Sequence, residues 1–312
     1  MSMRYPAGFI SAFFNPLKNP DAPTIGTATT SSATSLTIAF TAPANVGGSA
    51  ITSYTATAKR TSDSVLFTAS GASSPITVTG LTEVPFTATV VAVNSYGPSV
   101  SSAASNSVTP AEPPPTVIGQ AYGGGYYAGQ IGVSSVATHY LVVGPLASAQ
   151  TTNQWKNTGG NTQGADSDID GPQNTADIVA DGNATVYPCA HFCNDLVIGG
   201  YSDWYMPAKN ELEVCYFNLK PTTTSNNTSS GINPNAVPAR ASNYTAGNPA
   251  QTAAAAFVTS TGAQAFAVDY YWSSTDGPND GTARVQFFGY GIQSSYGKVN
   301  PFNVRAIRRV AV

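Results

Sequence analysis

The chain has 312 residues and a formal net charge of -3, and charged residues make up only 9% of it. A typical soluble protein has roughly 25% charged residues, so hydroxyl and amide side chains supply the polar surface here, as in β-rich surface proteins. The charge balance excludes nucleic acid as the main partner, because phosphate binding needs clustered lysine and arginine. No apolar run approaches the roughly 18 residues of a membrane span, and the N-terminus lacks the pattern of a secretory signal. We therefore expect neither membrane insertion nor export by that route.

Residues 1–21 are predicted to form a docking arm. The segment combines three prolines with the apolar residues Tyr5, Phe9, Ile10, Phe13, Phe14 and Leu17. It is too aromatic for a flexible tail and too broken for a long helix, so we expect its aromatic side chains to be buried against another surface. That surface is either the next domain of the same chain or a partner.

Residues 22–110 are predicted to be an all-β sandwich. Apolar and polar residues alternate in several short runs, and glycine- or proline-containing turns separate them. The runs are Ser35–Phe40, Ile51–Thr57, Ile76–Val78 and Phe86–Asn94. With Ala22-Pro23, Gly80-Leu81-Thr82 and the turn at 95–98, this order resembles a fibronectin type III module. Phe40 and Phe86 stand where the family usually has tryptophan and tyrosine. The resemblance implies a spacer or an adhesive unit without catalytic chemistry.

A proline-rich linker, residues 111–116, is expected to separate this module from a second domain, residues 117–312. The second domain contains Trp155, Trp204 and Trp272. Its expected elements are a hairpin from 123–129 and 139–143, helices at 174–179, 189–196 and 208–219, an irregular excursion over 221–262, and strands at 271–275, 283–288 and 304–310.

The second domain is organised around residues 199–212. Gly199 and Gly200 allow the backbone geometry of a tight turn, and Trp204 is large enough to anchor a core. Pro207 suits the start of a helix, and Glu211 would lie near the positive end of its dipole.

A set of spaced motif residues resembles the Lcl/DUF1566 domain, a member of the C-type-lectin-like fold. The residues are Gly200, Tyr201, Asp203, Trp204, Pro207, Glu211, Trp272, Ser273, Ser274 and Arg305. The resemblance implies an α+β head that holds these residues as scaffold, similar to the head of phage tropism proteins. The overall expectation is thus a mostly β chain, in which a fibronectin type III-like sandwich precedes a C-type-lectin-like domain.

Three cysteines, Cys189, Cys193 and Cys215, lie in the second domain. An odd number leaves at least one of them free or paired between chains, and buried apolar thiols are the simpler interpretation. The related family often has a cysteine where this chain has Ala306. The resemblance therefore implies that Cys193 pairs with Cys215 or stays reduced.

Four acidic residues follow the spacing of a calcium-binding loop. Asp166, Asp168 and Asp170 take positions 1, 3 and 5, Gly171 takes position 6 and Asp177 takes position 12. The alternative is a turn followed by a capped helix. Calcium is the one cofactor that the sequence suggests.

Residues between Trp272 and Arg305 carry the side chains expected of an adaptable binding surface, rich in tyrosine, asparagine and serine. The candidates are Asp276, Asn279, Asp280, Arg284, Gln286, Phe288, Tyr290, Gln293, Tyr296, Lys298, Asn300, Phe302 and Asn303. Strand alternation predicts that Arg284, Gln286 and Phe288 share one face, while Val285 and Phe287 share the other. In the related phage proteins this stretch forms the exposed face. The alternative is an ordinary solvated sheet.

No enzyme is expected, because His139 and His191 lie far apart without a triad-like pattern. The resemblances together favour a receptor-binding tail fibre or tip protein on the exterior of a phage virion. Its head would bind a host surface glycan or protein, and residues 1–21 would contact other virion proteins. The alternatives are a capsid or tail decoration protein and a bacterial surface adhesin. A homo-oligomer, and a trimer in particular, would suit either virion role.

Overall fold

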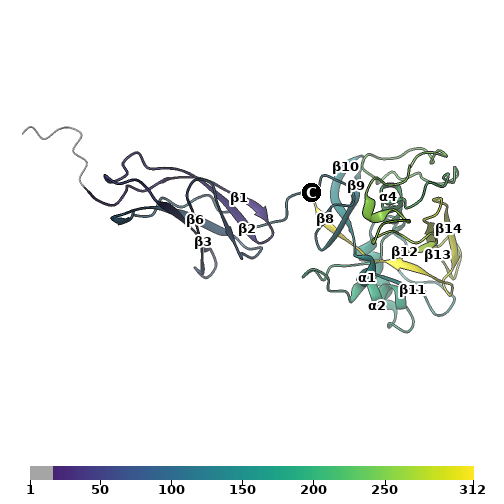
Figure 1. The fold of residues 1–312 in the computed structure, drawn as a ribbon. Helices are drawn as coiled ribbons and strands as arrows, with labels where there is room; N and C mark the ends of the chain where they lie inside the picture. The colour runs from purple at the N-terminus through teal and green to yellow at the C-terminus, as the bar shows by residue number, and fades with distance from the viewer. Residues whose placement is uncertain (1–16) are drawn as a thin grey trace, which may run out of the picture. The chain divides into compact units, whose positions relative to one another are not determined.

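The computed structural model describes residues 17–312, and the chain separates into two compact units on either side of the bond between Pro113 and Pro114 (Figure 1). This division falls within the proline-rich segment 111–116. Most of the predicted docking arm, residues 1–16, lies outside the described residues. Within residues 17–312, no helix has the length and apolar content needed to cross a bilayer.

The N-terminal unit is a sandwich of two antiparallel sheets within residues 17–113. Its strands are β1 (Thr24–Ser32), β2 (Ser35–Thr41), β3 (Ser53–Arg60), β4 (Leu66–Gly71), β5 (Ile76–Thr79), β6 (Phe86–Asn94) and β7 (Gly97–Pro98). One sheet has the order β1-β2-β5 and the other has the order β4-β3-β6-β7. Every second residue of β6 is buried between them, from Phe86 to Asn94. This strand order is that of the fibronectin type III fold, so the predicted sandwich is confirmed.

A ladder of serines closes the edge of the second sheet beyond β7. Ser99, Ser102 and Ser105 each donate a backbone N–H to a carbonyl of β6, at 2.7, 2.9 and 2.8 Å. Their Oγ atoms accept in turn from the backbone N–H groups of Ala92, Val90 and Ala88, at 3.0, 2.9 and 2.9 Å. The serines are three residues apart along the chain, whereas their partners in β6 are two residues apart. This edge is therefore not a regular strand. Such an edge is a poor template for a further strand.

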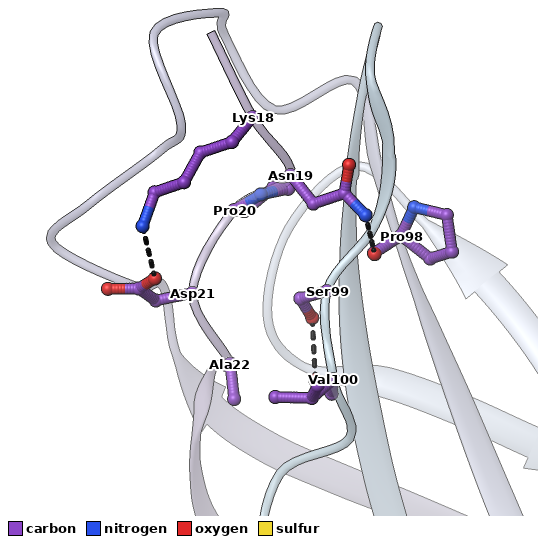
Figure 2. Close-up of a pocket in the computed structure, with 8 residues that line it drawn as sticks. All are labelled: Lys18, Asn19, Pro20, Asp21, Ala22, Pro98, Ser99 and Val100. Carbon is purple, nitrogen blue, oxygen red and sulfur yellow. Dashed lines mark hydrogen bonds and ion pairs between the residues drawn. The ribbon is translucent and has the colours of Figure 1, made fainter. Parts of the chain in front are cut away.

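The described end of the predicted arm lies against the segment that follows β7 (Figure 2). Asn19 donates its Nδ2 to the carbonyl of Pro98 at 2.8 Å, and Lys18 pairs with Asp21 at 3.5 Å. Lys18 also donates its backbone N–H to the carbonyl of Gly47. Residues 18–21 therefore pack on the sandwich of the same chain, which is one of the two alternatives expected for this segment.

The C-terminal unit contains two sheets. In the sequence, its helices lie between the strands of these sheets. The helices are α1 (Leu146–Ala149), α2 (Gly171–Asp181), α3 (Pro188–Asn194), α4 (Lys209–Leu219) and the 3-10 helix η1 (Ala255–Phe257). The strands are β8 (Ala121–Tyr122), β9 (Gly125–Val133), β10 (Val136–Val143), β11 (Gln150–Gln154), β12 (Tyr270–Asp276), β13 (Thr282–Phe287), β14 (Gln293–Gly297), β15 (Pro301–Arg305) and β16 (Ile307–Ala311).

One of these sheets joins the beginning of the unit to its end. It has the order β16-β10-β9-β8, and β10 pairs antiparallel with β16 from His139↔Ala311 to Val143↔Ile307 (Figure 1). The second sheet has the order β11-β15-β12-β13-β14. It separates two hydrophobic clusters. Trp272 and Val285 belong to one cluster, which also includes Ile178 of α2, whereas Tyr271 belongs to the other, with Tyr216 of α4.

Candidate binding face

The motif residues around Trp204 hold the C-terminal strand to a glycine turn. Gly199 and Gly200 adopt φ of 63° and 85°, a region that favours glycine. Trp204 is 2% exposed and donates its Nε1 to the carbonyl of Tyr201 at 3.1 Å. Arg308 forms a two-point ion pair with Asp203, at 2.8 and 2.9 Å. Its guanidinium lies 3.7 Å from the centroid of the Tyr201 ring.

Glu211 fixes the start of α4 from a fully buried position. Its Oε2 accepts from the backbone N–H of Ala208 at 2.8 Å, while its Oε1 accepts from Tyr205 at 2.5 Å and from Arg309 at 2.6 Å. Burial raises the pKa of Glu211. With every oxygen engaged inside the core, this carboxylate is structural.

The remaining motif residues connect the two halves of the unit. Trp155 donates its Nε1 to the carbonyl of Ser273 at 2.9 Å, and Ser274 donates its N–H to the carbonyl of Pro207 at 2.8 Å. Arg305, which is 1% exposed, donates to the carbonyls of Gly144 and Gln264. These motif residues therefore stabilise the fold of the unit, and a binding surface would be formed by other residues.

The predicted binding residues divide between the interior and the surface. Gln286, Phe288, Lys298 and Asn303 are buried, which corrects their assignment to an exposed face. Phe288 packs against Phe266, with ring centroids 4.1 Å apart, because the segment before β12 covers that side of the sheet. Lys298 pairs with Asp276 at 2.6 Å, and Asn303 accepts at Oδ1 from Thr152 at 2.8 Å.

The exposed candidates include two tyrosines that belong to a continuous aromatic surface. Tyr290 and Tyr296 are each 36% exposed, and Phe302 is half-buried. Asn279 and Asp280 are exposed in the turn before β13, while Arg284, Gln293 and Asn300 are half-buried.

Five aromatic rings form what we call the aromatic row: Tyr290, Phe287, Tyr270, Tyr296 and Phe302. Consecutive ring centroids lie 4.7, 4.9, 4.9 and 5.3 Å apart. The cross-strand pair Tyr270↔Phe287 places β12 and β13 side by side in it. Such spacings are typical of favourable aromatic pairs. Because these rings remain partly exposed, the row offers an aromatic surface of mutually tilted rings.

Polar groups accompany the aromatic row. Tyr296 donates its hydroxyl to that of Tyr270 at 3.1 Å, and this hydrogen bond, together with burial, raises the pKa of Tyr270. The phenol of Tyr270 is therefore protonated at neutral pH. Asp269 is exposed beside Tyr270 and accepts from the Nδ2 of Asn303 at 3.2 Å. A row of rings bordered by hydroxyl, amide and carboxylate groups can stack on a sugar ring and hydrogen-bond its hydroxyls.

Sequence reasoning missed two members of the aromatic row, Tyr270 and Phe287. Tyr270 lies one residue before the strand predicted from 271. Phe287 was placed on the face opposite Arg284, Gln286 and Phe288, and the cross-strand pairs Tyr270↔Phe287 and Tyr271↔Gln286 agree with that alternation. The alternation was the available signal, but the binding residues predicted for this strand were Arg284, Gln286 and Phe288, of which Gln286 and Phe288 are buried.

The four acidic residues of the predicted calcium loop do not come together. Asp168 pairs with Lys209, Asp170 pairs with Arg309 at 3.5 Å, and Asp177 accepts from Gln173 at 2.9 Å. Asp166 is exposed. Within the described part of the chain, no group of three or more histidine, cysteine or acidic residues has the geometry to hold a metal. The calcium prediction is wrong, and the alternative is correct: Asp170 caps α2 by accepting from Gln173 N–H at 3.4 Å.

The three cysteines, Cys189, Cys193 and Cys215, are free and buried. Burial raises the pKa of each thiol, so none is poised as a thiolate nucleophile. The interpretation as buried apolar thiols is confirmed, and Cys193 does not pair with Cys215.

The N-terminal unit contains a pocket of about 530 Å³ between residues 18–22 and 98–100 (Figure 2). Its amide and charged side chains are already paired, Asn19 with the carbonyl of Pro98 across the pocket and Lys18 with Asp21 within residues 18–21. The aromatic row is therefore the stronger candidate site.

No protein-family model and no curated protein matches this chain. Solved structures of similar fold include a crystal structure of titin domains, with 27% identity, a TM-score of 0.29 and coverage of 30% of this chain and 33% of that chain. The FN5 domain of Drosophila Lar has 22% identity and a TM-score of 0.25, over 30% of this chain and 97% of that one. The fourth FNIII domain of a human protein has 22% identity and a TM-score of 0.27, over 35% and 94%. This chain thus spans about a third of the titin structure that it matches.

Proposed function

We propose that the chain is a non-enzymatic, receptor-binding protein of a bacteriophage virion, located on its exterior at a tail fibre or tip. Its C-terminal unit is a C-type-lectin-like head that binds a glycan on the bacterial surface. The observation that carries the proposal is the aromatic row, in which each of five rings contacts the next.

The ligand class follows from the chemistry of the row. Ring faces stack on the apolar C–H face of a sugar, and the phenol groups of Tyr270 and Tyr296 supply hydroxyls beside them. Tyrosine provides such contact area at little cost in side-chain entropy. Charged residues are few and the net charge is -3, so binding of strongly anionic polymers is disfavoured.

Two features support a lectin-like head. The pairing of β10 with β16 brings the beginning and end of the unit into one sheet of an α+β unit, the class of head that the resemblance implies. The motif residues near Trp204 and Trp272 resemble the Lcl/DUF1566 domain, and they serve as scaffold. A fibronectin type III-like unit before such a head suits a spacer on a virion surface.

The proposal is tested by probing the full chain against an array of bacterial surface polysaccharides. A double variant, Tyr290→Ala with Tyr296→Ala, removes two exposed rings of the row. Tyr96→Ala, at an exposed tyrosine of the other unit, is the matched control. We expect polysaccharide binding that the double variant loses and the control retains.

Two results would reject the proposal. Binding to bacterial proteins but to no polysaccharide would overturn the glycan as ligand. Virions that lack the protein yet adsorb at the normal rate would instead place it among the decoration proteins.

A further inference from the structure

Lys298 is a fully buried lysine that contacts a carboxyl group inside the C-terminal unit. It follows β14 directly, and its Nζ lies 2.6 Å from the Oδ1 of Asp276, the last residue of β12. The side chain of Lys298 is 0% exposed and that of Asp276 is 14% exposed. Lysine is rarely buried to this degree, because an ammonium group taken out of water loses its hydration. A reaction that removes both buried charges is therefore favoured at this position.

Backbone contacts hold the amine and the carboxyl group together. Lys298 donates its N–H to the carbonyl of Gly281 at 2.8 Å, and its own carbonyl accepts from the N–H of Trp155 at 2.9 Å. Asp276 donates its N–H to the carbonyl of Ala165 at 2.6 Å. The ring centroid of Trp155 lies 4.3 Å from the Nζ of Lys298. Two groups held in contact in this way react as if each were present at a very high concentration.

The carboxyl group of Asp276 also accepts hydrogen bonds from the backbone. Its Oδ1 accepts from the N–H of Gly277 at 3.0 Å, and its Oδ2 accepts from the N–H of Thr162 at 3.4 Å. Negative charge develops on these oxygens when a nucleophile attacks the carboxyl carbon. Backbone N–H groups that already point at the oxygens stabilise that charge.

A chain of hydrogen bonds, which we call the relay, leads from the amine to a second carboxylate. The Nζ of Lys298 donates to the Oγ1 of Thr162 at 3.3 Å. The hydroxyl of Tyr187 lies 3.1 Å from that Oγ1 and donates to Asp181, so Thr162 donates to Tyr187. Asp181 is exposed, and the relay therefore ends at the surface. Burial lowers the pKa of Lys298, which makes loss of a proton from its Nζ easier.

We propose that Lys298 and Asp276 condense into an isopeptide bond, a covalent amide between Nζ and Cγ that links the end of β12 to the turn after β14. One proton first passes from Nζ to the carboxylate, which makes both groups neutral. The lone pair of Nζ then attacks Cγ, while Nζ gives a second proton to the relay. The Cγ–O bond breaks, the departing hydroxyl takes that proton, and one water molecule leaves. The reaction needs no co-reactant and does not depend on the function of the aromatic row.

Mass spectrometry of the denatured full chain tests the proposal. We expect a mass lower than that of the sequence by one water molecule, and a protease digest that contains a branched peptide joining Lys298 to Asp276. A folded protein with the full mass of its sequence would overturn the proposal and leave an ordinary ion pair. Loss of water without the branched peptide, as in cyclisation at Asp280-Gly281, would overturn it as well.

Three variants test the parts of the reaction. Lys298→Met removes the nucleophile and should restore the full mass. Lys209→Met is the matched control, because Lys209 pairs with a different carboxylate, that of Asp168, and this variant should still lose water. Asp181→Asn removes the proton acceptor and should slow the loss of water by about a hundredfold or more, in protein sampled at intervals after cell-free synthesis. Thermal melting checks that each variant is folded. Loss of water that persists in Lys298→Met would overturn the assignment, and an unchanged rate in Asp181→Asn would overturn the relay.

Discussion

Phe287 and Phe288 are neighbours in sequence, yet their side chains lie on opposite sides of the same sheet. Phe287 contacts Tyr270 and Tyr290 in the partly exposed aromatic row. Phe288 is fully buried and contacts Phe266, Tyr216 and Tyr271. Consecutive residues of an extended chain point to opposite faces, so this pair separates the proposed binding function from the stability of the core.

Replacing these two phenylalanines should therefore have different effects. Phe288→Ala removes a buried ring and should lower the free energy of unfolding by about 3–5 kcal/mol. Phe287→Ala removes a half-buried ring and should cost about 1–2 kcal/mol, while weakening polysaccharide binding. Denaturant unfolding and array binding of both variants measure the two effects. Equal destabilisation by the two substitutions would contradict this division of the sheet.

Arg305 is predicted to be essential for the stability of the C-terminal unit. It is buried, and its guanidinium donates to the carbonyls of Gly144 and Gln264, at 2.9 and 2.7 Å. Burial lowers its pKa to about 10. Arg305→Met leaves those carbonyls unpaired and should cost about 2–4 kcal/mol.

Arg284→Met is the matched control, because Arg284 lies in the same sheet and its Nε has no hydrogen-bond partner. We expect a change below about 1 kcal/mol. Denaturant unfolding followed by tryptophan fluorescence compares the two variants, since the three tryptophans all lie in this unit. Similar losses in both variants would show that the hydrogen bonds of Arg305 are not the cause.

The serine ladder of the N-terminal unit makes a prediction about single hydroxyl groups. Ser102 is buried, and its Oγ accepts from the backbone N–H of Val90 at 2.9 Å. Ser102→Ala leaves that N–H unpaired and should cost about 1–3 kcal/mol. Ser101→Ala, at the exposed neighbouring position, should stay within about 0.5 kcal/mol. Thermal unfolding that shifts equally in the two variants would rule out the ladder as a stabilising element.

The stability of the C-terminal unit should fall at alkaline pH. Burial raises the pKa of Tyr271 from its ordinary value of 10.0 to about 12, and burial also raises the pKa of Tyr205, Tyr216 and Tyr244. A raised pKa means that the folded state holds the proton more tightly than the unfolded state. This stability is fully present below pH 10 and is lost as the pH rises toward the folded-state pKa. For Tyr271 alone, the loss approaches about 2–3 kcal/mol at pH 12.

Denaturant unfolding between pH 8 and pH 12 measures this dependence. Tyr271→Phe should flatten part of the slope, whereas Tyr96→Phe, at an exposed position, should leave it intact. A free energy of unfolding that stays constant above pH 10 would contradict the assignment of these phenols to the core.

Local patterns in the sequence were enough to predict much of the fold. The alternation of Phe86–Asn94 matches β6 in both of its bounds. The helix expected from residue 208 begins at Lys209, with Glu211 bonded back to the N–H of Ala208. These features depend on contacts within a few residues or on a regular period, which a single sequence displays directly.

The features that sequence reasoning missed depend on distant segments. Which face of β13 meets solvent is decided by two distant rings. Phe266, in the segment before β12, covers Phe288, and Tyr244, in the irregular excursion over 221–262, covers Tyr216. The acidic loop loses its resemblance to a calcium site because Lys209 and Arg309 pair with its carboxylates from far along the chain. No local spacing reveals either arrangement.

The most direct test of the proposed role of the aromatic row is the dissociation constant of the full chain for whole cells of the proposed bacterial host. Wild type, Tyr290→Ala with Tyr296→Ala, and the control Tyr96→Ala would be compared, each with an unfolding curve that shows it is folded. We predict at least about tenfold weaker binding for the double variant, as expected when exposed aromatic anchors are removed, and unchanged binding for the control. Unchanged binding of a folded double variant would contradict the assignment of the aromatic row as the receptor-binding surface.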